Sequence, residues 1–268
     1  MKKQISALLI LALLLTGCSL TRGKEEKQTT TEEILAQASG TDAYYDPNSS
    51  IPEYTGTATQ TDSTVPEDPA SWTMNDIPEY SGNPYIVINN DEPFFTADEM
   101  TTECYTYYGE LDSLGRAQYS MGVICKDELA EGSRGAIGHI RPSGWNQNKY
   151  EGVVDTEPPY LMQRSHLLMW KMTGDSSNIP ENLISGCQYF NAQMLEQETI
   201  VLNYIKSGGK VVYRVTPYYK GDNLLATGVL MEAASPENPG EFKMCRFVYN
   251  VQPGIEIDYA TGENWLAQ

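Results

Sequence analysis

The single long helical run of this chain, residues 191–206, constrains its fold more than any other feature. Leu195, Leu202 and Ile205 are among its apolar positions, and a Gly208-Gly209 pair follows where the helix should stop. The segments before and after this run instead contain short β-type stretches separated by turn residues. One principal helix between two groups of strands predicts an α+β domain whose central antiparallel sheet is crossed by that helix.

The expected strands lie on both sides of the helix. They are residues 85–89, 106–111, 117–123, 160–168, a piece through Leu183 and Ile184, and residues 210–215, 224–232 and 242–251. Thr96 and Glu99 have the spacing of a capping box, which predicts a short helix after Thr96. Residues 131–155 are rich in Gly and polar side chains and are expected to form long loops.

The N-terminus is typical of a processing signal. Two lysines precede an apolar run at residues 5–15, which is too short to span a bilayer comfortably. The run ends in Leu15-Thr16-Gly17-Cys18, which resembles a bacterial lipobox. We expect residues 1–17 to be a lipoprotein signal peptide and Cys18 to be lipidated, so that an extracytoplasmic protein is anchored in the cell membrane. The alternative is a plain secretory signal with an incidental cysteine.

Composition changes sharply after this signal. Residues 18–76 are poor in large aliphatic side chains and rich in polar and acidic ones, which predicts a disordered acidic tether. Residues 77–268 remain as one compact domain, long enough to bury a hydrophobic core. The formal net charge of the whole chain is −18, which argues against the broad basic surface of a tight nucleic-acid binder. A nucleic-acid role would therefore depend on a local site in which metal ions offset the repulsion.

A six-residue motif occurs twice near the start of the domain. Ile51-Pro52-Glu53-Tyr54-Thr55-Gly56 recurs 26 residues later as Ile77-Pro78-Glu79-Tyr80-Ser81-Gly82. Two copies are too few for a solenoid. The second copy leads directly into the first expected strand, and we therefore place the start of the domain near residue 77.

Four cysteines follow Cys18, and an extracytoplasmic location permits disulfides. A tight turn between the second and third expected strands would place Cys104 opposite Cys125. A bridge between them would leave Cys187 and Cys245 as the second pair. Three pairings are possible in principle, and free buried cysteines are the alternative.

The residues suited to chemistry lie around the helix. His166 is one of two histidines, and a side chain that titrates near neutral pH can take a proton from water. Arg164 would share its face on a strand and could contact a phosphate oxygen. His139 has no such partner pattern and is expected to be structural or on the surface.

Asn191 and Glu198 are seven residues apart and would share one face of the helix. An amide oxygen and a carboxylate on one face allow one group to bind a cation directly and the other to hold its waters, which suits Mg²⁺. Asn191 could instead be the N-cap of its helix. A metal role therefore predicts that another group caps the helix.

Taken together, these segments resemble the DNA/RNA non-specific endonucleases with a ββα-metal, or His-Me finger, active site. The likeness rests on Gln163-Arg164-Ser165-His166-Leu167-Leu168, Thr173-Gly174, Glu181-Asn182-Leu183-Ile184-Ser185-Gly186, Tyr189-Phe190-Asn191 and Met194-Leu195. Flanking segments similar to the secreted Gram-positive branch are Leu111-Asp112-Ser113-Leu114-Gly115-Arg116, Arg141-Pro142-Ser143-Gly144-Trp145, Tyr213-Arg214-Val215-Thr216-Pro217 and Val251-Gln252-Pro253-Gly254-Ile255-Glu256-Ile257-Asp258-Tyr259. The resemblance covers about residues 77–262.

By that resemblance, His166 is the general base and Asn191 the direct ligand of Mg²⁺, which Mn²⁺ can replace. Glu198 is a carboxylate that positions metal-bound water. Asn182 is implied to orient the site or the substrate, and Arg164 to contact the phosphate or the leaving group. The chain departs from the usual Asp-Arg-Gly-His motif of the family at the first and third positions.

These departures are Gln163 and Ser165. Gln163 can still form hydrogen bonds but brings no negative charge to support the basicity of the histidine. Compared with close relatives in the family, the helix is also one residue shorter between Asn191 and the glutamate. Glu196 is therefore an alternative candidate to Glu198. Glu196 would lie about 160° away around the helix, too far to serve the same role.

The sequence thus predicts a lipid-anchored, Mg²⁺-dependent endonuclease that hydrolyses DNA, with RNA as a second candidate substrate. Its activity should fall as the pH drops through the ordinary pKa of a histidine, about 6.5. One alternative is a catalytically weak or inactive surface lipoprotein that keeps the nuclease fold and only binds nucleic acid. Another is a solute-binding lipoprotein. No protein partner is inferred.

Overall fold

The computed structural model describes residues 73–268. The expected signal peptide, the expected lipidation at Cys18 and the expected tether up to residue 72 lie outside these described residues. Four residues before the expected boundary, Thr73 caps a 3₁₀ helix at Met74–Asp76. Met74 already packs against buried residues of the domain.

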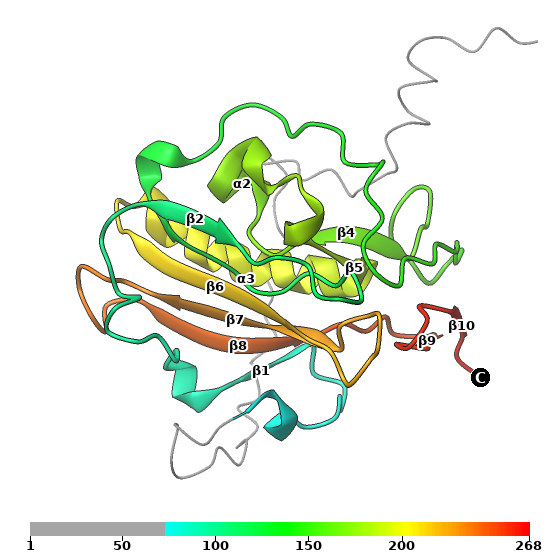
Figure 1. Cartoon of the computed structure of the whole chain (residues 1–268). Coiled ribbons are helices and arrows are strands. Elements are labelled where there is room, and N and C mark those ends of the chain that lie inside the picture. The colour runs from blue at the N-terminus through cyan, green and yellow to red at the C-terminus, as the bar shows by residue number, and fades with distance from the viewer. Residues whose placement is uncertain (1–72) are drawn as a thin grey trace, which may run out of the picture.

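The expected α+β architecture, a central antiparallel sheet with one principal helix, is confirmed (Figure 1). Six strands pair in the order β1-β8-β7-β6-β3-β2, and every neighbouring pair is antiparallel. They are β1 (Tyr85–Val87), β2 (Tyr105–Tyr108), β3 (Ser120–Ile124), β6 (Val211–Tyr218), β7 (Gly228–Ala234) and β8 (Lys243–Tyr249). Most of residues 131–155 form loops, as expected.

Two small antiparallel sheets accompany the large one. They consist of β4 (Met162–His166) with β5 (Leu183–Cys187), and of β9 (Ile255–Ile257) with β10 (Asn264–Leu266). The helices are α2 (Trp170–Thr173), α3 (Gln188–Lys206) and the 3₁₀ turns Met74–Asp76, Asn89–Asp91, Lys126–Glu128, Gly174–Ser177 and Pro180–Asn182. None of the helices within residues 73–268 is both long enough and apolar enough to cross a membrane.

The helix α3 packs against one face of the large sheet. Figure 1 shows it lying behind the sheet and running roughly along the strands in this view, with the β4–β5 hairpin near its N-terminal end. Its buried side chains include Phe190, Met194 and Val201, which join the main hydrophobic core with residues of β6 and β7. The helix ends at the expected place, where Gly208 has a φ of 112° that favours glycine.

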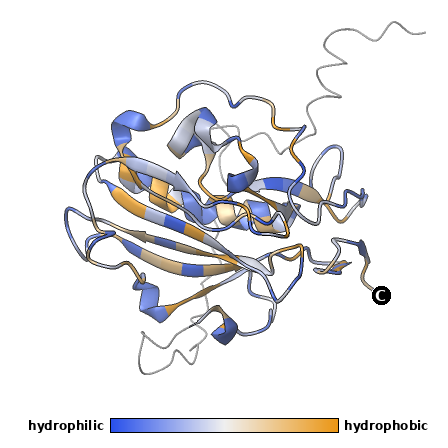
Figure 2. Ribbon diagram, viewed as in Figure 1, coloured by the Kyte–Doolittle hydropathy of each residue, from blue (hydrophilic) through white to orange (hydrophobic). Residues whose placement is uncertain are grey.

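The opposite face of the sheet is covered by the N-terminal part of the domain. Figure 2 shows hydrophobic residues along the central strands. Successive side chains of a strand point to opposite faces, and nearly every residue of β7 and β8 is buried, so both faces of the sheet carry apolar side chains. Ile77, Phe94 and Met100 pack against buried residues on this second face. The sheet is therefore buried on both sides, by α3 and its neighbouring loops on one and by residues 73–100 on the other.

The predicted bridge between Cys104 and Cys125 is confirmed, with the two Cα atoms 6.0 Å apart. The predicted pair of Cys187 and Cys245 is wrong, because both are free and buried. Cys187 belongs to the core on the α3 face, whereas Cys245 belongs to the cluster on the opposite face. The sheet itself therefore separates the two thiols.

The predicted helix after Thr96 is also wrong, although the capping-box hydrogen bonds form. The backbone N–H and hydroxyl of Thr96 donate to the Glu99 carboxylate over 2.8 and 3.0 Å. Residues 97–99 nevertheless form only a turn. One oxygen of Glu99 thus accepts the hydrogen bonds of Thr96, and the other forms an ion pair with Arg214 of β6 at 2.7 Å.

Candidate active site

The candidate site is built on a ββα unit in which β4, β5 and α3 follow one another. His166 is the last residue of β4 and pairs with Leu183, the first residue of β5. Arg164 pairs with Ser185 and, two residues from His166, lies on the same face of the strand. Because α3 begins immediately after β5, the hairpin and the helix are fixed relative to each other by a continuous chain.

Small residues allow the helix to pack closely on this hairpin. A Cβ atom at Gly186 would lie 2.3 Å from Ser165 Oγ and 2.6 Å from the ring of Phe190. No side chain larger than that of glycine fits there. The hydroxyl of Ser165 is buried, and among the described residues it has no hydrogen-bond partner.

A polar network fixes the imidazole of His166. Its Nε2 lies 3.1 Å from Oδ1 of Asn178. The amide of Asn178 is oriented by its Nδ2 group, which donates to Oδ1 of Asp175 over 3.1 Å, and Trp170 donates to the same oxygen over 2.8 Å. The amide oxygen therefore faces the imidazole. Nε2 then carries the hydrogen, and in the neutral ring Nδ1 holds the lone pair that accepts a proton.

Sequence reasoning missed Asn178 and Asp175. They lie in the polar segment at 173–178, which the sequence marks only as a turn. An Asp and an Asn three residues apart are common in turns, so the signal does not distinguish a histidine partner from an ordinary loop residue.

Asn182 organises the loop that carries this network. Its Oδ1 accepts from the backbone N–H of Leu168 over 2.9 Å, and its Nδ2 donates to the carbonyls of Leu168 and Ser177 over 2.9 and 3.1 Å. The side chain is fully buried. Asn182 thus joins both ends of the loop between β4 and the 3₁₀ turn. Its burial leaves no side-chain surface for a direct contact with substrate.

Arg164 is held by a neighbouring loop. Its Nε and Nη2 groups donate to the carbonyls of Ile140 and Gly138 over 2.7 and 2.8 Å. The guanidinium carbon lies 4.2 Å from the centre of the Trp145 ring. The side chain is only 6% exposed, so the guanidinium is fixed in orientation. His139 lies on the same loop and is exposed, as expected.

Asn191 is not the N-cap of its helix. The helix begins three residues earlier than expected, at Gln188, and Cys187 is the N-cap. The first-turn N–H groups of Gln188 and Tyr189 donate to the carbonyl of Leu161 over 2.8 Å and to Oε1 of Gln252 over 2.9 Å. Acceptors from elsewhere in the chain thus bind the N–H groups of the first turn of the helix. The amide of Asn191, partly exposed, makes no hydrogen bond to any described residue.

Glu198 lies two turns further along α3, on the same side of the helix as Asn191. Burial raises the pKa of its carboxyl to about 8, and Oε1 is buried without a partner among the described residues. The hydroxyl of Tyr213 is also buried without a partner, and burial together with the nearby Glu198 charge raises its pKa. Buried polar groups are normally paired, so this carboxylate fits a role in holding an ion or its waters.

No cluster of three or more His, Cys, Asp or Glu side chains able to hold a metal ion exists within residues 73–268. A cation near Asn191 would therefore be held by few protein groups and would retain much of its water shell. That arrangement suits Mg²⁺, which is dehydrated reluctantly and commonly keeps several waters.

A family model described as DNA/RNA non-specific endonuclease matches residues 96–236. This match covers more than half of the chain and contains every candidate site residue of the ββα unit. The chain belongs to this family.

A curated relative of this endonuclease family member is a deoxyribonuclease from Streptococcus dysgalactiae subsp. equisimilis. The two are 26% identical over 210 residues, which is 62% of this chain and 62% of that protein. The match thus spans less than two thirds of the relative.

Solved structures give the same fold. NucA from Streptococcus agalactiae without metal is 21% identical, with a TM-score of 0.61 over 72% of this chain and 92% of that one. NucA with bound magnesium is 20% identical, with a TM-score of 0.57 over 68% and 86%. The Sda1 nuclease with bound zinc is 25% identical, with a TM-score of 0.50 over 61% and 80%.

The departures of this endonuclease family member from the usual motif lie away from the imidazole. Gln163 is three residues from His166 and therefore lies on the opposite face of β4. Its side chain is buried, and its Nε2 donates to the carbonyl of Tyr160 over 3.1 Å. The rival carboxylate, Glu196, is partly exposed and accepts a long hydrogen bond from Gln193.

Proposed function

We propose that this domain is an extracytoplasmic endonuclease that hydrolyses phosphodiester bonds in DNA, with RNA as a second candidate substrate. The observation that carries the proposal is the ββα unit, in which an oriented imidazole occurs together with an amide and a buried carboxylate oxygen that have no hydrogen-bond partner within residues 73–268. His166 is oriented by Asn178, while Asn191 and Glu198 lie on one side of the helix that follows. Family membership and the nuclease relatives support this function.

His166 acts as the general base in this proposal. Neutral imidazole accepts a proton at Nδ1 from the attacking water while the water oxygen bonds to phosphorus. The bond from phosphorus to the 3′ oxygen breaks, the 3′ oxygen takes a proton from solvent water, and the products are a 3′-hydroxyl and a 5′-phosphate end. The hydrogen bond from Nε2 to Asn178 becomes stronger as the ring gains positive charge, since charged donors make stronger hydrogen bonds.

Asn191 and Glu198 are the residues that would hold a divalent cation and its waters, with Mg²⁺ preferred and Mn²⁺ as a substitute. When bound, such a cation stabilises the negative charge that develops around phosphorus. The solved relatives with magnesium and with zinc support a divalent ion. Arg164 is proposed to contact the phosphate or the leaving group, and Asn182 to hold the loop that orients His166.

The proposal places the domain outside the cytoplasm on a lipid anchor. Residues 1–17 would be the signal peptide, Cys18 the lipidated residue, and the acidic stretch that follows the tether. The lipobox-like sequence at the end of the apolar run supports this placement. Globomycin treatment of cells that express the full chain should block maturation if Cys18 is lipidated, and a chain that matures normally under globomycin would contradict the anchor.

Plasmid nicking by the full chain, with Mg²⁺ and with chelator, tests the activity. His166→Ala should lower the rate on the order of 10² to 10⁴, because the general base is removed. His139→Ala is the matched control, because that histidine is exposed on a neighbouring loop, and it should keep the wild-type rate. Equal cleavage by wild type and His166→Ala would overturn the mechanism.

Binding of DNA without metal-dependent cleavage would instead favour a nuclease-fold protein that only binds nucleic acid.

A further inference from the structure

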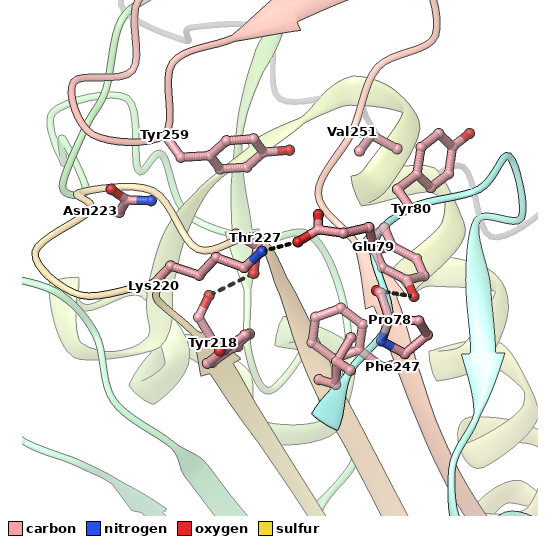
Figure 3. Close-up of a pocket in the computed structure, with 12 residues that line it drawn as sticks. Pro78, Glu79, Tyr80, Tyr218, Lys220, Asn223, Thr227, Phe247, Val251 and Tyr259 are labelled. Carbon is pink, nitrogen blue, oxygen red and sulfur yellow. Dashed lines mark hydrogen bonds and ion pairs between the residues drawn. The ribbon is translucent and has the colours of Figure 1, made fainter. Parts of the chain in front are cut away.

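A groove outside the candidate active site is formed around the second copy of the repeated hexapeptide. It is lined by residues 77–80 and by residues that include Tyr218, Lys220, Phe247 and Tyr249. Figure 3 shows Glu79 pointing toward Lys220. None of the residues assigned to the ββα chemistry lines this groove. The segment at 77–80 is therefore a peptide docked on the domain beside an open space.

Each residue of the docked segment has a defined contact. Ile77 packs against the buried cluster that contains Phe247 and Tyr249. The carbonyl of Pro78 accepts a hydrogen bond from the Tyr249 hydroxyl over 2.9 Å. The other two contacts are an ion pair between Glu79 and Lys220, and an edge contact of the Tyr80 and Tyr249 rings at 5.6 Å between centroids.

The backbone that follows the docked segment also has a specific requirement. Gly82 has a φ of 104°, which favours glycine, and the chain then passes into β1. Ser81, between Tyr80 and this glycine, is exposed. The contacts of the docked segment are thus made by the side chains of Ile77, Glu79 and Tyr80 and by the carbonyl of Pro78, and a glycine follows two residues later.

The first copy of the motif has the same residue at each of these positions. Ile51-Pro52-Glu53-Tyr54 repeats the four contacting residues, and Gly56 repeats the glycine. The one position that differs, Thr55, corresponds to the exposed Ser81. The repeat thus preserves the four residues that contact the domain and changes a residue that makes none of these contacts.

We infer that this groove is a docking site for the Ile-Pro-Glu-Tyr sequence and that residues 51–54 of the same molecule occupy it when residues 77–80 leave. The second copy is favoured at rest, because only four residues join it to β1. The first copy is 26 residues away along the same chain. A short covalent connection presents it at an effective concentration on the order of millimolar. A second molecule would compete only at a similar concentration in solution.

Exchange of the copies changes how much chain separates the domain from its N-terminus. Docking of the first copy moves the attachment point 26 residues toward the N-terminus and releases residues 57–84 as a loop. The groove would then set the length of the segment that leads to Cys18.

Carbodiimide cross-linking of the full chain, followed by mass spectrometry, tests this inference, because it joins a lysine directly to a contacting carboxylate. In the wild type, Lys220 should be joined mainly to Glu79. In a Glu79→Gln, Tyr80→Ala double variant, the Lys220–Glu53 product should rise roughly tenfold or more. Addition of Tyr54→Ala to this variant should remove the gain.

The outcomes that overturn the inference are distinct. A Lys220–Glu53 product that does not rise in the double variant, or that is unaffected by Tyr54→Ala, would show that the groove does not recognise the first copy. A mixture of ¹⁵N-labelled and unlabelled chains separates the sources, because cross-links within one molecule never mix isotopes. Mixed products would assign the occupant to a second molecule. Both changed side chains lie at the surface, and thermal unfolding checks that the variants fold.

Discussion

Gly186 illustrates how one side chain sets the geometry of the hairpin and helix. Gly186→Ala would place a Cβ atom 2.3 Å from Ser165 Oγ and 2.6 Å from the Phe190 ring. We expect the free energy of unfolding to fall by about 1–3 kcal/mol, as overpacking of a close-packed site does. Urea denaturation measures this. Gly135→Ala is the control, since its Cβ would meet nothing closer than 3.8 Å, and equal losses in the two variants would contradict the packing argument.

Asn178 is expected to act through His166. Asn178→Ala removes the acceptor that keeps the proton on Nε2, so a fraction of the imidazole adopts the other tautomer. We expect kcat for DNA cleavage to fall by roughly 10- to 100-fold, less than on removal of the base itself. Asn238→Ala, in an exposed loop, is the control. An unchanged kcat with Asn178→Ala would show that the imidazole is oriented by other groups.

At the level of elements, the sequence predicts that α3 is a helix and where its C-terminal end lies. The spacing of its apolar residues and the Gly208-Gly209 stop are local properties of the sequence. Its start was not predictable, because Leu161 and Gln252 satisfy the first turn from distant parts of the chain. At Thr96 the capping-box hydrogen bonds form but no helix follows, and Glu99 also forms a tertiary ion pair with Arg214. Local patterns decide such elements only where no distant group competes.

Gln252 should therefore contribute to the stability of α3. Gln252→Ala removes the oxygen that accepts from the Tyr189 N–H. Loss of a cap of this kind costs about 1 kcal/mol, and the midpoint of urea unfolding should shift accordingly. Gln118→Ala is the control, because its amide donates only to the carbonyl of Arg116 in a nearby turn. A larger loss with Gln118→Ala would refute the capping role.

At the level of the whole molecule, the burial of the sheet on both faces determines side-chain contacts that the local sequence does not specify. The residues of the candidate site were predictable by type and order, but the contacts of His166 with Asn178 and the burial of Asn182 depend on how loops fold over the hairpin. The cysteines follow the same division. Cys104 and Cys125 flank a hairpin, so strand pairing alone brings them together. Whether Cys187 and Cys245 can meet depends instead on which face of the sheet each of them occupies, and they lie on opposite faces.

The state of the cysteines is a test of this global arrangement. Maleimide labelling of the native chain should leave Cys187 and Cys245 unmodified, because both are buried and burial raises the pKa of each thiol. In denaturant without reductant, both should react, while Cys104 and Cys125 should not. The bridge between Cys104 and Cys125 joins residues 21 apart and so closes a loop in the unfolded chain. Its reduction should lower the free energy of unfolding by about 3 kcal/mol. Peptide mapping that finds Cys187 joined to Cys245 would require the two faces of the sheet to be assigned differently.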